Sequence, residues 1–420
     1  MSKRIMIIGA GISAVSQAQI LCEKGVDCSL LEKSALTGGL ISCTDIKGNL
    51  YHKVGGHVFN SKNQNVLDWF WKHFDREHEF VHAERNAKVL LEGQYIGYPI
   101  ENHLFQLPNN IVKRVINEWF GSGHSDSSDG SDFQTFLVNR FGPTLYKLYF
   151  GPYNEKIWQT DLSEVSLDWL EGKLPMPNLK DSIVQNILKK EENEMVHSSF
   201  YYPKQGGSQF IIDRLGEELD IRTNYEVRKI QKTPKGWLIN DELEIRQVVY
   251  TGDIRQLLSI LHGVEDNLIE ACKAVEGLPS NGTSNVLCET DGSDLSWLYL
   301  PDPATKAHRI IYTGNFSVNN NAPNGRLTCT VEFSGKVSEA EMTAEVANLP
   351  GNLKVLASNY EPNSYVIQTH DTRVRVDRVR QLLQKEGFFL LGRFAEWEYY
   401  NMDKCIERAM ILTDQIIDGR

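Results

Sequence analysis

The segment IMIIGAGISA, residues 5 to 14, decides the fold that this sequence predicts. Its apolar run ends at Gly9 and predicts a short strand followed by a tight turn, and the helical spacing of apolar residues over 12 to 24 predicts a helix. The stretch VDCSLLEK, residues 26 to 33, then predicts a second strand. Together these elements predict a βαβ unit, the start of a Rossmann-type nucleotide-binding domain.

Two glycines and an acid within this unit indicate a dinucleotide site. Gly9 allows the tight turn, and Gly11 lets the backbone approach a pyrophosphate at the amino terminus of the helix. Ala14 stands where a third glycine is often found and still permits close helix packing. Glu32, 23 residues after Gly9, can accept the hydroxyls of an adenosine ribose and would repel a 2′-phosphate. The alternative is an ordinary glycine-rich turn.

Two further glycine pairs favour FAD over NAD. The first is in TGGL (37 to 40) and the second in KVGGHVFN (53 to 60). FAD is longer than NAD, lies extended, and needs additional points where the backbone comes close to it. A single such pair is equally typical of a surface turn, but three pairs within sixty residues suit a buried, extended ligand.

Downstream, the chain predicts an α/β protein with α+β insertions. Residues from about 85 to 195 predict mostly helix, including 110 to 120 and 134 to 158, and residues 285 to 335 alternate as in an antiparallel sheet. We expect three domains. They are a discontinuous FAD-binding domain (1–85, 196–255 and 365–420), a helical substrate domain (86–195) and an antiparallel-sheet substrate domain (256–364).

Composition excludes several classes of function. The net charge of -11 with interspersed charges argues against nucleic-acid binding, and no apolar stretch reaches the roughly 18 residues of a membrane-spanning helix. The amino terminus lacks the pattern of a secretion signal. Seven cysteines without a C-x-x-C pair predict a reduced, cytoplasmic protein in which all seven are buried small hydrophobes, and no cluster of cysteine and histidine predicts a metal site.

Several longer motifs make the sequence similar to a known family. In order along the chain they are GGHVFN (55–60), PYNEKIW (152–158), YPKQGGSQ (202–209), SWLYLP (296–301), HRIIYTGNFS (308–317) and GRFAEWEYYNMD (392–403). With the flavin segments, they resemble the UDP-galactopyranose mutases within the flavin amine-oxidase superfamily. The resemblance implies a pyranose–furanose mutase acting on a UDP-sugar or related sugar nucleotide. The reduced flavin would attack the anomeric carbon through N5, without net redox change.

The resemblance also implies roles for individual residues. Arg309 matches an arginine facing the diphosphate, Arg393 one near the flavin and sugar, and Tyr399 a hydroxyl donor to the diphosphate. A guanidinium suits phosphate because its planar fork binds two oxygens. His57 belongs to a turn against the flavin. The alternative for Arg309 is a solvated strand residue, and for His57 a hydrogen bond within its turn.

The expected site therefore has three sets of residues. The catalytic set is His57, Arg309, Arg393 and Tyr399. The FAD-binding set is Gly9, Gly11, Ile12, Ser13, Glu32, Lys33, Gly39, Leu40, Gly56, His57, Val227, Gly392, Arg393, Asn401 and Met402. The substrate-binding set is Tyr153, Trp158, Lys173, Arg309 and Tyr399, of which the two aromatic residues Tyr153 and Trp158 are equally typical of a core.

Departures from the family pattern leave the sugar nucleotide open. Asn60 stands where bacterial mutases have a histidine, Asn401 where they have an aspartate, and Lys173 where an arginine is expected. The segment before residue 380 also lacks their tyrosine-proline pair. The alternative function is an FAD-dependent oxidoreductase of the amine-oxidase or protoporphyrinogen-oxidase type, whose cleft should be lined by aliphatic residues. The oligomeric state is not predicted, and a homo-oligomer is compatible with the sequence.

Overall fold

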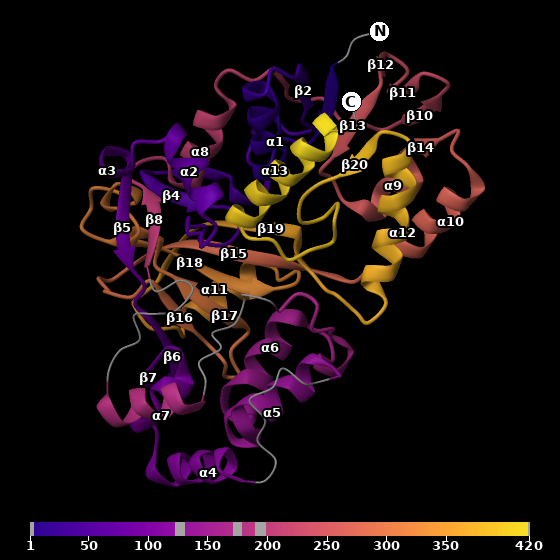
Figure 1. Cartoon of the computed structure of the whole chain (residues 1–420). Coiled ribbons are helices and arrows are strands. Elements are labelled where there is room, and N and C mark those ends of the chain that lie inside the picture. The colour runs from indigo at the N-terminus through magenta and orange to yellow at the C-terminus, as the bar shows by residue number, and fades with distance from the viewer. Residues whose placement is uncertain (1–3, 122–130, 171–178, 190–198, 419–420) are drawn as a thin grey trace.

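The computed structural model describes residues 4–121, 131–170, 179–189 and 199–418. A five-stranded parallel sheet forms the upper part of the molecule in Figure 1, in the order β20-β13-β1-β2-β9. Its strands are β20 (Phe388–Leu390), β13 (Gln247–Tyr250), β1 (Ile5–Ile8), β2 (Cys28–Leu31) and β9 (Ile221–Arg222). Helices α1 (Ile12–Glu23) and α13 (Met402–Asp418) pack side by side against it.

Apolar runs explain why this sheet forms. Every residue of β1 and β2 is buried, as expected for parallel strands with both faces covered. Ile5 pairs with Cys28 on one side and with Gln247 on the other, so a strand from the middle of the chain completes the N-terminal βαβ unit. The predicted βαβ unit and the α/β fold class are confirmed.

A small sheet extends this part of the molecule. It has the order β12-β11-β10-β14, with β12 (Leu243–Ile245), β11 (Gly236–Ile239), β10 (Ile230–Thr233) and β14 (Leu261–His262). Helices α9 (Leu257–Ile260), α10 (Asp266–Glu276) and α12 (Thr372–Lys385) lie beside it in Figure 1. Leu257 and Cys272 share a hydrophobic cluster with Val248 of β13 and Phe388 of β20. Residues 256 to 278 therefore pack with the parallel sheet, not with the sheet domain to which the sequence assigned them.

The central seven-stranded sheet has the order β19-β15-β18-β17-β16-β6-β7. Its strands are β6 (Ala87–Leu91), β7 (Gln94–Gly97), β15 (Ser280–Thr290), β16 (Trp297–Tyr299), β17 (Ala307–Ile311), β18 (Leu327–Ser334) and β19 (Lys354–Val366). All neighbours are antiparallel except β16 and β6. This confirms the antiparallel sheet over 285 to 335. It corrects the start of the mostly helical region, because β6 and β7 form a hairpin in which β6 pairs with a strand more than 200 residues away.

Helices below this sheet form the lower part of the molecule (Figure 1). They are α4 (Asn109–Trp119), α5 (Phe133–Leu145), α6 (Gly151–Trp158) and α7 (Leu179–Leu188). The predicted helix over 134 to 158 is interrupted, since Gly142 has φ 85° and a π-helical turn, Tyr146–Phe150, joins α5 to α6. Such a turn re-aims the helix that follows it. It brings α6 against the central sheet, where Tyr153 and Trp158 are buried.

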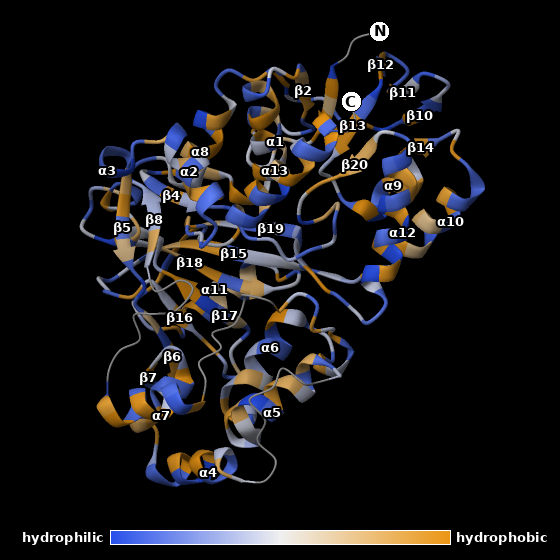
Figure 2. Ribbon diagram, viewed as in Figure 1, coloured by the Kyte–Doolittle hydropathy of each residue, from blue (hydrophilic) through white to orange (hydrophobic). Residues whose placement is uncertain are grey.

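The remaining elements connect these layers. They are β3 (Cys43–Ile46), β4 (Asn49–His52), α2 (Gln64–His73), α3 (Arg76–Glu79), β5 (Phe80–Glu84), β8 (Ser199–Pro203), α8 (Gly207–Gly216) and α11 (Glu339–Val346). Strands β3 and β4 form one hairpin, and β5 pairs with β8. Figure 2 shows orange and blue residues alternating around the helices, whereas β15 of the central sheet is mostly white.

Three expectations from composition can be compared with the structure. All seven cysteines are free thiols, and six are buried, but Cys22 near the end of α1 is exposed, so the prediction that all are buried is wrong there. No helix within the described ranges is long and apolar enough to cross a membrane. The described residues also contain no group of side chains able to hold a metal ion.

Candidate functional site

Nearly all of the predicted site residues line one cavity of about 900 Å³. It begins at the carboxyl edge of the parallel sheet and continues between the central sheet and α6. Every described member of the three predicted sets lines it except Gly392, and Lys173 lies outside the described residues. Gly392 lies beside the cavity, because a Cβ atom there would approach Ser13 Oγ to 2.6 Å. What each residue binds stays a prediction.

The first two glycine pairs lie side by side at the amino terminus of α1. Gly11 and Gly38 form a bridge, and the Gly38 N–H donates to Ala10 O at 2.8 Å. Gly9 has φ +106°, and a Cβ atom there would lie 2.2 Å from Thr251 Oγ1. The first turn of α1 carries no acidic side chain and no side-chain cap. Its backbone N–H groups are therefore available to a bound anion, because no side chain of that turn competes for them.

Besides the ribose contact predicted from the sequence, Glu32 makes two hydrogen bonds to the backbone. Its Oε2 accepts from the Ala10 N–H and its Oε1 from the Ser34 N–H, both at 2.8 Å. Glu32 therefore holds the glycine turn in place while it lines the cavity. Each carboxylate oxygen keeps a lone pair for a further donor, such as a ribose hydroxyl.

The third glycine pair is fixed by a buried carboxylate. The Gly55 N–H donates to Glu332 Oε1 at 2.7 Å, and a Cβ atom on Gly56 would lie 2.6 Å from Ile311 Cγ2. Gly56 is thus required for packing against β17 as well as for access to the cavity. His57 follows, and its Nε2 atom is buried without a hydrogen-bond partner among the described residues.

His57 is held in its neutral form. Burial, and then the nearby charge of Arg393, lower the pKa of His57 to about 3. The imidazole therefore carries no charge near neutral pH. An uncharged ring with an unpartnered nitrogen beside the cavity fits a neutral, hydrogen-bonding ligand such as a flavin ring.

Arg309 and Glu332 form a buried ion pair behind the cavity wall. Arg309 Nε donates to Glu332 Oε2, and Arg309 Nη2 donates to the Tyr365 hydroxyl at 3.2 Å. Burial by itself raises the pKa of Glu332, but the Arg309 guanidinium outweighs burial and holds that pKa below its usual range. Sequence reasoning missed Glu332, since one acid in an alternating strand gives no signal of its partner.

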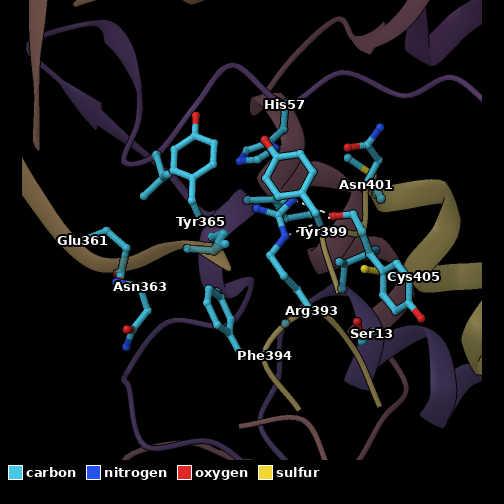
Figure 3. A pocket seen from close by; sticks show the side chains of 18 of the residues that line it. Ser13, His57, Glu361, Asn363, Tyr365, Arg393, Phe394, Tyr399, Asn401 and Cys405 are labelled. Carbon is cyan, nitrogen blue, oxygen red and sulfur yellow. Dashed lines mark hydrogen bonds between the residues drawn. The ribbon is translucent and has the colours of Figure 1, made fainter. Parts of the chain in front are cut away.

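Arg393 lies at the centre of the pocket, beneath the ring of Tyr399 (Figure 3). Its guanidinium is 4.7 Å from the Tyr399 ring centroid. Arg393 Nη1 donates to Ser364 O at 2.9 Å, and Nε donates to Tyr400 O at 3.1 Å. Backbone carbonyls of β19 and of the loop between β20 and α13 thus hold this arginine.

Aromatic side chains form the opposite wall. Tyr399 stacks on Tyr365 with ring centroids 5.6 Å apart, and Trp158 meets both tyrosines edge to face. Tyr153 meets Tyr299 edge to face at 5.4 Å. Tyr365 was not predicted from the sequence, because its segment lacks the tyrosine-proline pair of the bacterial mutases. Tyr299 was quoted within a motif but given no role.

The departures from the family pattern occupy defined places. Asn60 lines the cavity and its Nδ2 donates to Ser199 O at 2.8 Å. Asn401 precedes α13, where its carbonyl accepts from the Cys405 N–H at 3.0 Å. Lys33 and Val227 lie with Glu32 toward one end of the cavity, next to a second, open depression that shares Lys33.

Comparison with known proteins identifies relatives along the chain. Residues 7–74 match the family of NAD(P)-binding Rossmann-like domains. The chain is 23% identical to UDP-galactopyranose mutase of Mycoplasma pneumoniae over 98% of its own length and 96% of that protein. It is also 23% identical to dTDP-fucopyranose mutase of Escherichia coli, over 41% of this chain and 46% of that protein.

Solved structures share the complete fold. A reduced UDP-galactopyranose mutase matches with a TM-score of 0.88 at 20% identity, covering 100% of this chain and 96% of that one. A putative protoporphyrinogen oxidase from Exiguobacterium matches with a TM-score of 0.76 at 15% identity, covering 100% of both chains. The resemblance found in the sequence motifs is confirmed: this chain has the fold of the UDP-galactopyranose mutases and is similar to one of them over 98% of its length.

Proposed function

We propose that this protein is an FAD-dependent sugar-nucleotide mutase that interconverts the pyranose and furanose forms of a UDP-sugar. The observation that carries the proposal is one continuous cavity, which joins the glycine turn at α1 to a cleft lined by Arg309, Arg393 and Tyr399. A dinucleotide cofactor and an anionic sugar nucleotide can therefore meet in one space. Similarity to mutases along the whole chain supports the same function.

The residues of the cavity fit FAD. The paired glycines at Gly11 and Gly38 and the free amino terminus of α1 suit a pyrophosphate, and Glu32 suits a ribose. The neutral His57, whose Nε2 has no hydrogen-bond partner among the described residues, suits the flavin ring. When bound and reduced, FAD supplies a nucleophilic nitrogen, N5, toward the anomeric carbon of the sugar.

The side chains of this protein would orient the substrate and stabilise its leaving group. Arg309 would donate to diphosphate oxygens, where a charge develops as the glycosidic bond breaks. The Tyr399 hydroxyl would add a donor beside it, and the stacked rings of Tyr365 and Trp158 would exclude water. Arg393 would hold the part of the cofactor that faces the substrate cleft. His57 stays neutral and would transfer no proton at this position.

The alternative is an FAD-dependent oxidoreductase of the protoporphyrinogen-oxidase or amine-oxidase type. That class shares the fold, because the putative protoporphyrinogen oxidase covers the whole chain. Flat apolar substrates require an apolar cleft, whereas three arginines line this one. The composition of the cleft therefore favours the sugar-nucleotide mutase.

The deciding experiment measures product formed per electron supplied. Dithionite-reduced protein is incubated with UDP-galactopyranose or dTDP-fucopyranose, and the furanose product is separated by chromatography. A mutase turns over many times without consuming reductant, and oxidised protein is inactive. The Tyr399→Phe variant should retain FAD and lose activity. Product formation in fixed proportion to oxygen uptake or dye reduction would refute the mutase and support the oxidoreductase.

A further inference from the structure

A third arginine, Arg85, lines the same cavity from the short connection between β5 and β6. Its guanidinium lies between two aromatic faces, 5.1 Å from the ring centroid of Tyr98 and 4.9 Å from that of Trp297. Arg85 Nη2 also donates to the hydroxyl of Tyr299. Aromatic faces attract a cation but do not cancel its charge.

The charge of Arg85 has no acidic partner in the described part of the chain. No carboxylate there lies within ion-pair distance, and Arg85 Nε is buried without a hydrogen bond. The other two arginines of the cavity differ. Arg309 is paired with the buried Glu332, and Arg393 donates to two backbone carbonyls. Arg85 thus keeps its charge and some of its donors available, and a half-buried guanidinium without an ion-pair partner gains stability when an anion meets it.

Tyr299 links Arg85 to Arg309, the residue that is proposed above to bind the diphosphate. Tyr299, which accepts from Arg85, stands directly opposite Arg309 in the pairing of β16 and β17. Arg85 and Arg309 therefore flank one tyrosine. On its far side, Tyr299 meets the ring of Tyr153.

We infer that Arg85 binds a phosphate oxygen of the nucleoside diphosphate and supplies a positive charge that no carboxylate of the described residues pairs with. The inference rests on the proposed function and specifies a further binding residue for its substrate. A guanidinium fixed by aromatic stacking presents its remaining N–H groups in one plane, which is the geometry that phosphate requires. Uridine without phosphate would gain nothing from this charge.

The test compares UDP with uridine. Calorimetric titrations at fixed ionic strength are made with the flavin-loaded wild type and with Arg85→Met, which keeps an apolar stem of similar length. UDP affinity should fall by about 10- to 150-fold, as for the loss of a charge-assisted hydrogen bond, while uridine affinity changes by less than about twofold. The Arg85→Lys variant, which keeps the charge and loses the fork, should fall between wild type and Arg85→Met.

Arg76 provides a matched control outside the cavity. Its guanidinium also lies over a tyrosine and a tryptophan ring, Tyr201 and Trp71, and donates to the Tyr201 hydroxyl. Arg76→Met should bind UDP like the wild type. Equal losses of UDP and uridine affinity in Arg85→Met, or no loss of either, would overturn the inference. Wild-type protein that binds neither compound would overturn the proposed function, and with it the inference.

Discussion

Replacing Glu332 by glutamine should lower the free energy of unfolding, because it removes the carboxylate that pairs with Arg309. Glu332 is fully buried, and its two oxygens serve Arg309 and the Gly55 N–H. The glutamine is nearly isosteric and can keep a hydrogen bond, but it leaves the Arg309 charge without a partner. Breaking a buried ion pair costs about 3 to 5 kcal/mol. Because the Arg309 side chain is 21% exposed, we expect the lower end, about 3 kcal/mol.

The loss should depend on pH in a defined direction. The pKa of Glu332 in the folded protein lies below its usual value, so its stabilisation is fully present above the unfolded pKa of about 4.3. That stabilisation is lost as pH falls through the lower, folded pKa. The difference between wild type and Glu332→Gln should therefore be constant from about pH 8 to pH 5 and shrink at lower pH.

The assay is urea unfolding of the flavin-loaded protein at several pH values. Glu289→Gln is the matched control, because Glu289 is a buried carboxylate in the same sheet whose cations, Arg326 and Lys354, lie farther away at 3.8 and 3.7 Å. In an Arg309→Met background the Glu332→Gln change should cost much less. A Glu332→Gln protein within about 0.5 kcal/mol of wild type at pH 7, or a difference that persists in acid, would refute the ion-pair argument.

Three further changes test other parts of the site. Glu32→Ala should weaken FAD retention by about 1.5 to 3 kcal/mol through the lost ribose contact, measured by flavin release during dialysis, and unchanged retention would remove Glu32 from the cofactor site. Gly9→Ala should prevent flavin loading, because the new Cβ would meet Thr251 Oγ1 and the positive φ is strained, whereas Gly25→Ala, with no atom within 4 Å of its Cβ, should still load flavin. His57→Gln should flatten the rise of stability with pH that the wild type shows between about pH 3 and pH 6.5, since His57 stays neutral when folded and protonates when unfolded. An unchanged slope would show that His57 is exposed to water.

Much of the site was predictable from the sequence because the cofactor part is local. The turn at Gly9, the helix after it and Glu32 all lie within one βαβ unit, where spacing along the chain fixes positions in space. The family motifs added Arg309, Arg393 and Tyr399. Arg309 is more than 80 residues before the other two, and all three line one cavity in the structure.

The sequence by itself determined the α/β class, the N-terminal βαβ unit and the antiparallel sheet, because these follow from periodicities of a few residues. Only the tertiary structure decided that the hairpin of β6 and β7 joins the central sheet, since β16, the partner of β6, is more than 200 residues away. It also decided which charges are cancelled. Glu332 neutralises Arg309 across two neighbouring strands, whereas the Arg85 guanidinium contacts aromatic rings and a hydroxyl and no carboxylate among the described residues. Charge pairing depends on distances of a few ångströms between residues that are remote in sequence. Local sequence patterns do not show which of these residues come that close.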